Sequence, residues 1–293
     1  MSDETKKQTV YEYLRECAFS KPMHLLMADE ADSYTCSDIY GRVNRTACGL
    51  NRIGIVQGSR VVLRTERNTA SAVMFLSLMA VGAEIILVDE NITVLDYFKY
   101  KEFENTQGYI THENNDGWVR VSFVESDRDI IPSEGAFKAC TQKDMAATQA
   151  VSLRCADKNW MVLSQRDIID MVCGMSLLDD MLYCSNLCIA SIAGLVGLLS
   201  VIGSIIKGYS VIFPKLFGAR HLLHCISCYD VDFVSAGKED YLALTEYVHE
   251  YDTDRLKFGI TDDIVSDNHL DSIIEKMLNI NLVRIGRYAE SSF

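Results

Sequence analysis

The chain alternates amphipathic stretches with short apolar runs along most of its length. Apolar residues at intervals of three to four predict helices over residues 9–19, 36–53, 70–81, 96–104, 219–228, 239–251 and 269–278, and one that begins at residue 166. Short apolar runs predict strands over residues 24–28, 60–64, 84–88, 108–111, 146–152, 161–163, 209–213 and 232–235. This alternation predicts an α/β fold, with two lobes of mixed β-sheet flanked by helices.

Residues 114–140 interrupt the alternation, because they are polar and include the run from Ser126 to Asp129 followed by Pro132. We interpret this segment as a surface linker. It places the boundary between a first lobe, residues 1–140, and a second lobe, residues 141–293. The lobes are expected to exchange strands, so this linear boundary is approximate.

The stretch from Leu187 to Ile206 contains no charged residue and has about the length of a membrane span. Serines and glycines interrupt it, and no basic cluster flanks either side as the positive-inside rule would require. We therefore expect a buried helix or helix pair here rather than a membrane segment.

Composition narrows the class of partner. The formal net charge is -13 and the pI is about 4.9, which disfavours nucleic acid and anionic membranes because their phosphates would be repelled.

The ten cysteines are scattered, and Cys173, Cys184 and Cys188 lie in apolar stretches, so we interpret them as small buried hydrophobic residues rather than a disulfide framework. With a polar N-terminal segment and no signal peptide, a cytoplasmic protein is expected.

One cysteine and histidine cluster invites a zinc hypothesis. His221, His224, Cys225 and Cys228 follow one another at i, i+3, i+4 and i+7, on one face of a helix. One helix cannot wrap four ligands around a single ion, since the outer two lie about 10 Å apart along its axis. We favour cysteines packed against the sheet with histidines at the rim, and predict no metal.

Several segments of the first half resemble the opening lobe of the adenylate-forming superfamily, which includes acyl-CoA synthetases, luciferases and the adenylation domains of nonribosomal peptide synthetases. The matching segments are YTCSDI (34–39), ACGL (47–50), GIVQGSRV (54–61) and LSLMAVGA (76–83). Further on, KGYSVIF (207–213) and YDVD (229–232) also resemble the family. The resemblance implies the large N-terminal domain of these enzymes. The family's small C-terminal lid domain, with its catalytic lysine, has no counterpart in the sequence.

The family's phosphate loop, Thr-Ser-Gly-Thr-Thr-Gly-x-Pro-Lys-Gly, falls on residues 151–160. Glycines let backbone N–H groups approach phosphate oxygens without a Cβ clash. The three glycine positions hold Leu153, Ala156 and Trp160, and the lysine position holds Asn159. The remaining loop positions considered for nucleotide contact are Ser152, Arg154, Cys155 and Lys158. We predict a degenerate phosphate loop.

Other positions of the family's site are also altered. Ser191 replaces a histidine, and Thr261, Asp262 and Asp263 fall on the family's Ser-Gly-Gly-Ala-Pro segment. Asp262 and Asp263 admit an acid/base or Mg²⁺ role, but we favour an exposed turn with an N-capping role. Glu290 resembles the family's magnesium-linked glutamate, although its motif has one residue too many. No catalytic residue is assigned, and Glu290 and Lys158 are the residual candidates.

These changes predict a degenerate, catalytically impaired relative that acts through binding. It would bind a small carboxylate or acyl ligand, or dock on an active synthetase or a carrier protein, without a cofactor. The alternative is a divergent ligase that uses ATP and Mg²⁺ through Arg154, Lys158 and Glu290, completed by a separate C-terminal domain. A truncated gene product without a retained role is the third hypothesis.

Overall fold

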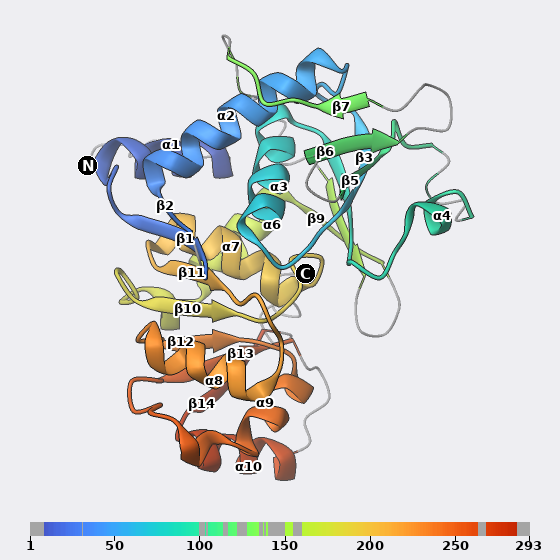
Figure 1. Cartoon of the computed structure of the whole chain (residues 1–293). Coiled ribbons are helices and arrows are strands. Elements are labelled where there is room, and N and C mark those ends of the chain that lie inside the picture. The colour runs from blue at the N-terminus through green and yellow to red at the C-terminus, as the bar shows by residue number, and fades with distance from the viewer. Residues whose placement is uncertain are drawn as a thin grey trace. The chain divides into compact units, whose positions relative to one another are not determined.

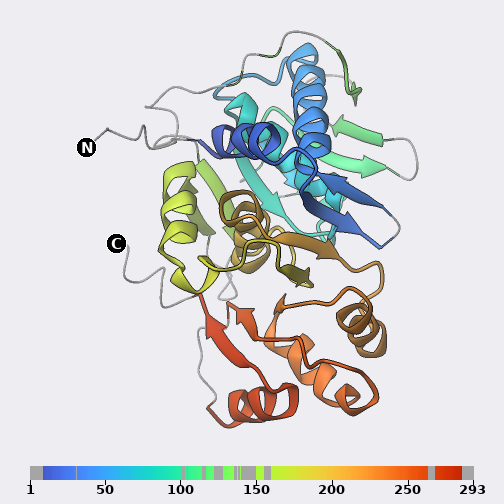
Figure 2. The ribbon, with the colours of Figure 1, turned by 90° about the vertical axis from the view of Figure 1, so that its left-hand side faces the viewer.

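A computed structural model describes residues 9–30, 32–99, 103, 105–113, 117–121, 128–134, 137, 139, 150–154, 160–262 and 268–285. The chain forms two compact units, each discontinuous in sequence (Figures 1 and 2). Unit 1 comprises Met1–His24, Thr35–Glu66 and Ala70–Asp170, and unit 2 comprises Leu25–Tyr34, Arg67–Thr69 and Met171–Phe293. The lobe boundary expected between residues 140 and 141 lies outside the described residues.

Unit 1 contains a mixed sheet of seven strands in the order β7-β6-β5-β3-β4-β8-β9. Its central strands pair in parallel, whereas β5-β6, β6-β7 and β8-β9 pair antiparallel. The strands are β3 Arg60–Arg64, β4 Glu84–Val88, β5 Tyr109–Glu113, β6 Gly117–Val121, β7 Arg128–Ile130, β8 Ala150–Arg154 and β9 Trp160–Ser164. The helices that lie wholly or mostly in unit 1 are α1 Val10–Ser20, α2 Cys36–Arg52, α3 Thr69–Val81, α4 Val94–Tyr97 and α6 Gln165–Gly174.

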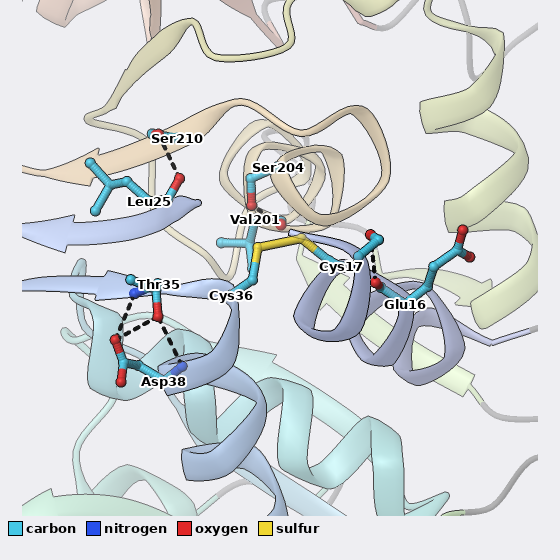
Figure 3. The surroundings of a disulfide bond; sticks show 10 residues. Glu16, Cys17, Leu25, Thr35, Cys36, Asp38, Val201, Ser204 and Ser210 are labelled. Carbon is cyan, nitrogen blue, oxygen red and sulfur yellow. Dashed lines mark hydrogen bonds between the residues drawn. A yellow bond between two sulfur atoms is a disulfide. The ribbon is translucent and has the colours of Figure 1, made fainter. Parts of the chain in front are cut away.

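Threonine caps explain where several of these helices begin. The side chains of Thr9, Thr35 and Thr93 each accept a hydrogen bond from the backbone N–H three residues on. The acidic side chain at that later position accepts a hydrogen bond from the backbone N–H of the threonine in return. The expected cap at Thr35 is confirmed, and Figure 3 shows its bonds with Asp38. After α2 the chain turns at Gly54, whose φ of 85° favours glycine.

The interpretation of the cysteines is wrong for one pair. Cys17, near the end of α1, and Cys36, the first residue of α2, form a disulfide with Cα atoms 5.9 Å apart (Figure 3). The sequence spacing did not indicate this pair, because the β1-β2 turn between the two helices brings them together. The cytoplasmic location stays a prediction.

The expected linker at residues 114–140 is also wrong, since it contains β6 and β7. Strand β6 begins at Gly117, whose φ is 96°, and pairs antiparallel with β5 over five residues. Buried Val119 and Val121 join a small core with Tyr97 and Tyr109. The helix expected over residues 96–104 is shorter and earlier, because the Thr93 cap starts α4 at Val94.

Unit 2 contains a seven-stranded sheet in the order β14-β13-β12-β10-β11-β1-β2. The pairings β1-β11, β11-β10, β10-β12, β12-β13 and β13-β14 are all parallel. The strands are β1 Leu25–Asp29, β2 Ser33–Thr35, β10 Ser185–Cys188, β11 Ser210–Phe213, β12 Phe233–Ser235, β13 Phe258–Thr261 and β14 Asn281–Arg284. The helices are α7 Leu195–Lys207, α8 Ala219–Cys228, α9 Lys238–Thr245 and α10 Asn268–Leu278, with 3-10 turns at Ser176–Leu178 and Val248–Glu250.

Helices α8, α9 and α10 share one face of this sheet, because their buried residues join a single hydrophobic core over β10, β11 and β12 (Figure 1). The helix expected over residues 239–251 is wrong in extent: α9 ends at Thr245 and a separate 3-10 turn follows. Strands β10, β13 and β14 were not predicted.

The expectation of a buried helix between Leu187 and Ile206 is confirmed for part of the stretch. Helix α7 is that helix, but the stretch begins with the end of central strand β10, which was not expected. Helix α7 has 13 residues and is buried from Leu195 to Ile205. Among the described residues, none of the helices combines the length and apolarity needed to cross a membrane.

Candidate functional site

The topology of unit 2 directs attention to the carboxyl edge of its sheet. The chain passes from β10 to β11 on one side, then returns to place β12, β13 and β14 on the other side of β10. The strand order therefore reverses between β10 and β12. In open parallel sheets, ligands bind outside the carboxyl ends of the strands at such a switch point.

The loop after β10 is held rigidly at this point. The N–H groups of Ile189 and Ala190 both donate to the Ser235 carbonyl, at 2.8 and 2.9 Å. The Ser191 hydroxyl accepts from the Ala193 N–H at 3.2 Å. A Cβ at Gly197 would lie 2.2 Å from the Ser191 carbonyl oxygen, so only glycine allows α7 to approach this closely.

Helix α7 begins beside this loop. Its N-cap, Gly194, supplies no side-chain hydrogen bond. The first N–H groups of a helix lack intrahelical acceptors and carry a partial positive charge. The start of α7 therefore favours a negatively charged or carbonyl group in its vicinity.

Thr261 and Asp262 lie two strands from β10 at the same edge. Thr261 ends β13 and is fully buried, and no hydrogen-bond partner for its Oγ1 is found within the described part of the chain. A buried hydroxyl without a partner is unusual and marks a place where a ligand or water belongs. Asp262 follows it and is half-buried, while Asp263 lies outside the described residues. The structure thus brings Ser191, Thr261 and Asp262 to one edge.

Two ionisable groups flank the switch point. Burial raises the pKa of the Cys188 thiol to about 12, so this thiol stays protonated at neutral pH and is a poor nucleophile. Burial also raises the pKa of Asp240, although the hydrogen bond from the Gly237 N–H partly opposes the shift. Asp240 caps the start of α9, directly after β12. The Cys188 thiol therefore lacks the properties of a catalytic nucleophile, and the Asp240 carboxylate is engaged as the cap of α9.

The predicted phosphate loop connects β8 to β9 in unit 1. These strands form an antiparallel hairpin in which Ser152 pairs with Val162 and Arg154 with Trp160. Trp160 is 40% exposed. Outside the described positions lie Cys155, Lys158, Asn159 and Glu290, together with the side chain of Arg154.

The cluster on α8 divides into two pairs. His221 and Cys225 meet Glu30, which follows β1, whereas Cys228 lies 3.5 Å from the His224 ring. Cys225 is buried as expected, but Cys228 is exposed, which corrects its expected packing against the sheet. Burial, reinforced by the Glu30 carboxylate, raises the pKa of the Cys225 thiol to about 12.

Sequence reasoning missed Glu30. It lies 191 residues from His221 along the chain. The only signal available was its place after a strand, because strands of one parallel sheet share their carboxyl edge.

Comparison with known proteins identifies the fold. No protein-family model and no curated protein sequence matches the chain. Among solved structures, the N-terminal domain of FACL13 from Mycobacterium tuberculosis superposes with a TM-score of 0.75 at 16% identity, covering 94% of this chain and 75% of that one.

Two further structures agree with this fold. An arginine-to-lysine variant of E. coli MenE with bound OSB-AMS gives a TM-score of 0.75 at 14% identity over 92% of this chain and 57% of its own. Klebsiella oxytoca NpsA in complex with 3-hydroxyanthranilyl-AMSN gives 0.74 at 14% identity, over 92% and 55%. The predicted α/β fold, that of the N-terminal domain of adenylate-forming enzymes, is confirmed, and the chain spans just over half of MenE and NpsA.

Proposed function

We propose that this protein is a degenerate relative of the adenylate-forming enzymes that acts by binding and does not adenylate. The proposal rests on a contrast between the fold, which matches that of these enzymes, and the sequence at the phosphate-loop positions, which does not match theirs. The fold superposes on FACL13 with a TM-score of 0.75. The segment that runs from the end of β8 to the start of β9, however, holds Leu153, Ala156 and Trp160 where a phosphate cradle needs glycine.

The proposed ligand is a small carboxylate or acyl compound at the carboxyl edge of the unit 2 sheet. The buried Thr261 hydroxyl, which lacks a partner among the described residues, can donate one hydrogen bond there. The uncapped start of α7 favours an oxygen that carries negative charge. In the related structures, MenE binds OSB-AMS and NpsA binds 3-hydroxyanthranilyl-AMSN.

An active synthetase or a carrier protein in the cytoplasm is the proposed macromolecular partner. A binding protein with this scaffold would influence a pathway by delivering or withholding a carboxylate. The net charge of -13 makes nucleic acid an unfavourable alternative.

Carboxylate-dependent exchange of labelled pyrophosphate into ATP tests the proposal. With a panel of aliphatic, aromatic and amino-acid carboxylates, we expect no exchange above the protein-free background, while E. coli MenE assayed in parallel shows that the assay works. Exchange that disappears in the Arg154→Ala/Lys158→Ala double variant would overturn the proposal. It would establish instead the ligase that uses ATP and Mg²⁺.

A further inference from the structure

Three side chains of different ligand chemistry converge at the carboxyl end of β1. Glu30 directly follows that strand, and His221 and Cys225 lie one turn apart on α8. Their ligand atoms lie within 4.8 Å of one another. His221 Nε2 is 2.6 Å from Glu30 Oε1, and Cys225 Sγ is 3.7 Å from that nitrogen and 3.9 Å from that oxygen.

These separations are close to those of a tetrahedral metal centre. With zinc bonds of about 2.0–2.1 Å to nitrogen or oxygen and about 2.3 Å to sulfur, neighbouring ligand atoms lie roughly 3.3–3.6 Å apart. The two sulfur distances, 3.7 and 3.9 Å, already approach this value. Only the hydrogen-bonded pair of Glu30 and His221 has to open, by less than about 1 Å, to admit an ion between them.

Neighbouring contacts hold the ligands in place. The Lys215 N–H donates to Glu30 Oε1, and the Tyr229 hydroxyl donates to the Glu30 carbonyl at 3.0 Å. Cys225 is 1% exposed and belongs to the core beneath α8. Partners of this kind orient metal ligands and limit the cost of ordering them.

The donor set indicates which ion fits. Thiolate, imidazole and carboxylate together suit zinc and its neighbours, whereas Mg²⁺ and Ca²⁺ prefer ligands that are all oxygen. The side chains of His221 and Glu30 are 27% and 21% exposed. Solvent therefore reaches the cluster and can supply water as the fourth ligand.

We propose that Glu30, His221 and Cys225 form a binding site for a divalent cation of the zinc class, which ties the end of β1 to helix α8. The site is independent of the proposed carboxylate ligand, so failure of one proposal leaves the other standing. The competing explanation is a Glu30–His221 ion pair that packs beside a buried thiol and binds no metal.

The same helix provides a matched control. His224 and Cys228 have the same residue types at the same spacing as His221 and Cys225, and both are exposed. Within the described chain, the only group of three metal-type ligands found is the one that contains Glu30. Substitutions in the control pair should therefore leave metal binding unchanged.

The test is a Co²⁺ titration of the full chain, freed of metal by a chelator and kept under a reductant without thiols. We expect one equivalent of Co²⁺ to produce thiolate-to-cobalt charge transfer and the strong visible bands of four-coordinate cobalt. Zn²⁺ should displace it, while excess Mg²⁺ should not. The absence of these bands in the wild-type protein would overturn the proposal.

The variants locate the site. Cys225→Ala should abolish the charge-transfer band, and Glu30→Gln and His221→Gln should each weaken Co²⁺ binding by at least about tenfold, because outer-shell changes alone cost that much. His224→Gln and Cys228→Ala should bind as the wild type does. Bands that persist in Cys225→Ala, or that disappear equally in the control variants, would contradict the assignment. Thermal unfolding in chelator checks that each variant folds. If Cys225→Ala does not fold, the Co²⁺ affinities of Glu30→Gln and His221→Gln test the assignment instead.

Discussion

At the scale of single residues, Asp232 holds the amino edge of the unit 2 sheet. It is 2% exposed and accepts hydrogen bonds from the Ser185 N–H and Lys257 Nζ, both at 2.9 Å. Burial raises the pKa of Asp232, but the bonds from Lys257 and Ser185 lower it by more, so its pKa lies below the ordinary 3.8. The ion pair with Lys257 correspondingly raises the pKa of that amine.

Asp232→Asn should therefore lower the free energy of unfolding at pH 7 by about 1–3 kcal/mol, since it removes a buried charged acceptor of two hydrogen bonds, while the Lys257 side chain left behind is 52% exposed. A folded-state pKa below 3.8 means that this stabilisation is present above about pH 4 and is lost as the pH falls further. Urea unfolding from pH 3 to 7 measures the difference, which should shrink toward the acid end.

Asp230→Asn is the control, because Asp230 pairs with Arg255 on the surface, where the two side chains are 71% and 55% exposed. Its effect should stay below about 1 kcal/mol. An Asp232→Asn effect no larger than that of the control would show that the buried Asp232 carboxylate does not stabilise the sheet.

A substitution at Thr261 is expected to stabilise the protein, whereas Asp232→Asn is expected to destabilise it. Thr261→Val keeps the shape of the side chain and removes a buried hydroxyl for which the described structure contains no partner. We expect the free energy of unfolding of the ligand-free protein to rise by about 1 kcal/mol, because an unsatisfied buried polar group is destabilising. Chemical denaturation measures it.

Ser235→Ala is the matched control, since the Ser235 hydroxyl donates to Asn186 Oδ1 at 3.1 Å in the same sheet. Its loss should destabilise the protein by about 1 kcal/mol. If Thr261→Val destabilised the protein as much as Ser235→Ala does, Thr261 would have a structural partner rather than a free place for a ligand.

At the scale of elements, the close contact of α7 with the loop after β10 shapes the candidate site. A Cβ at Gly197 would meet the Ser191 and Ala190 carbonyl oxygens at 2.2 and 2.9 Å. Both atoms are backbone, so no side chain can move aside. The contact therefore sets the distance between the helix and the switch point.

Gly197→Ala should lower the free energy of unfolding by about 1–3 kcal/mol, because overpacking outweighs the gain in helix propensity. Thermal unfolding by circular dichroism measures the change. Gly174→Ala, at the end of α6, is the control, since nothing lies within 4 Å of its added Cβ. A stabilised Gly197→Ala protein would show that α7 can shift and that the loop is not fixed by this contact.

Elements that are bounded by a capping residue or a glycine could be predicted from the sequence. The Thr35 cap and Gly54 bounded α2, and β3, β4 and α8 were predicted with their observed bounds. Strand β10 could not be separated from α7, because both are apolar and the join between them contains no charged residue. Strands β6 and β7 were missed because they are short and lie between polar segments.

The candidate site was predictable only in part. The family resemblance selected Ser191, Thr261 and Asp262, and the structure places all three at one sheet edge. Glu30 could not be found in this way, because its neighbours on α8 are brought to it by the pairing of β1 with β11. Pairing between segments this far apart leaves no local pattern in the sequence.

At the scale of the whole molecule, the chain shares its fold with proteins of very different sequence. Identity to FACL13 is 16%, yet the superposition covers 94% of the chain. Cores tolerate extensive apolar substitution when volume and pattern are preserved. Phosphate cradles tolerate little, because they depend on glycine at fixed positions. The proposed loss of nucleotide binding would account for a shared fold whose sequence lacks glycine at the loop positions.

Calorimetric titration of the full chain with ATP and Mg²⁺, near physiological ionic strength, tests this account most directly. We predict no binding heat, and no shift of the unfolding temperature at millimolar ATP, since a ligand that does not bind the folded state cannot stabilise it. Saturable binding in the micromolar range, weakened by Arg154→Ala or Lys158→Ala, would contradict the account and show that the altered loop still holds a nucleotide.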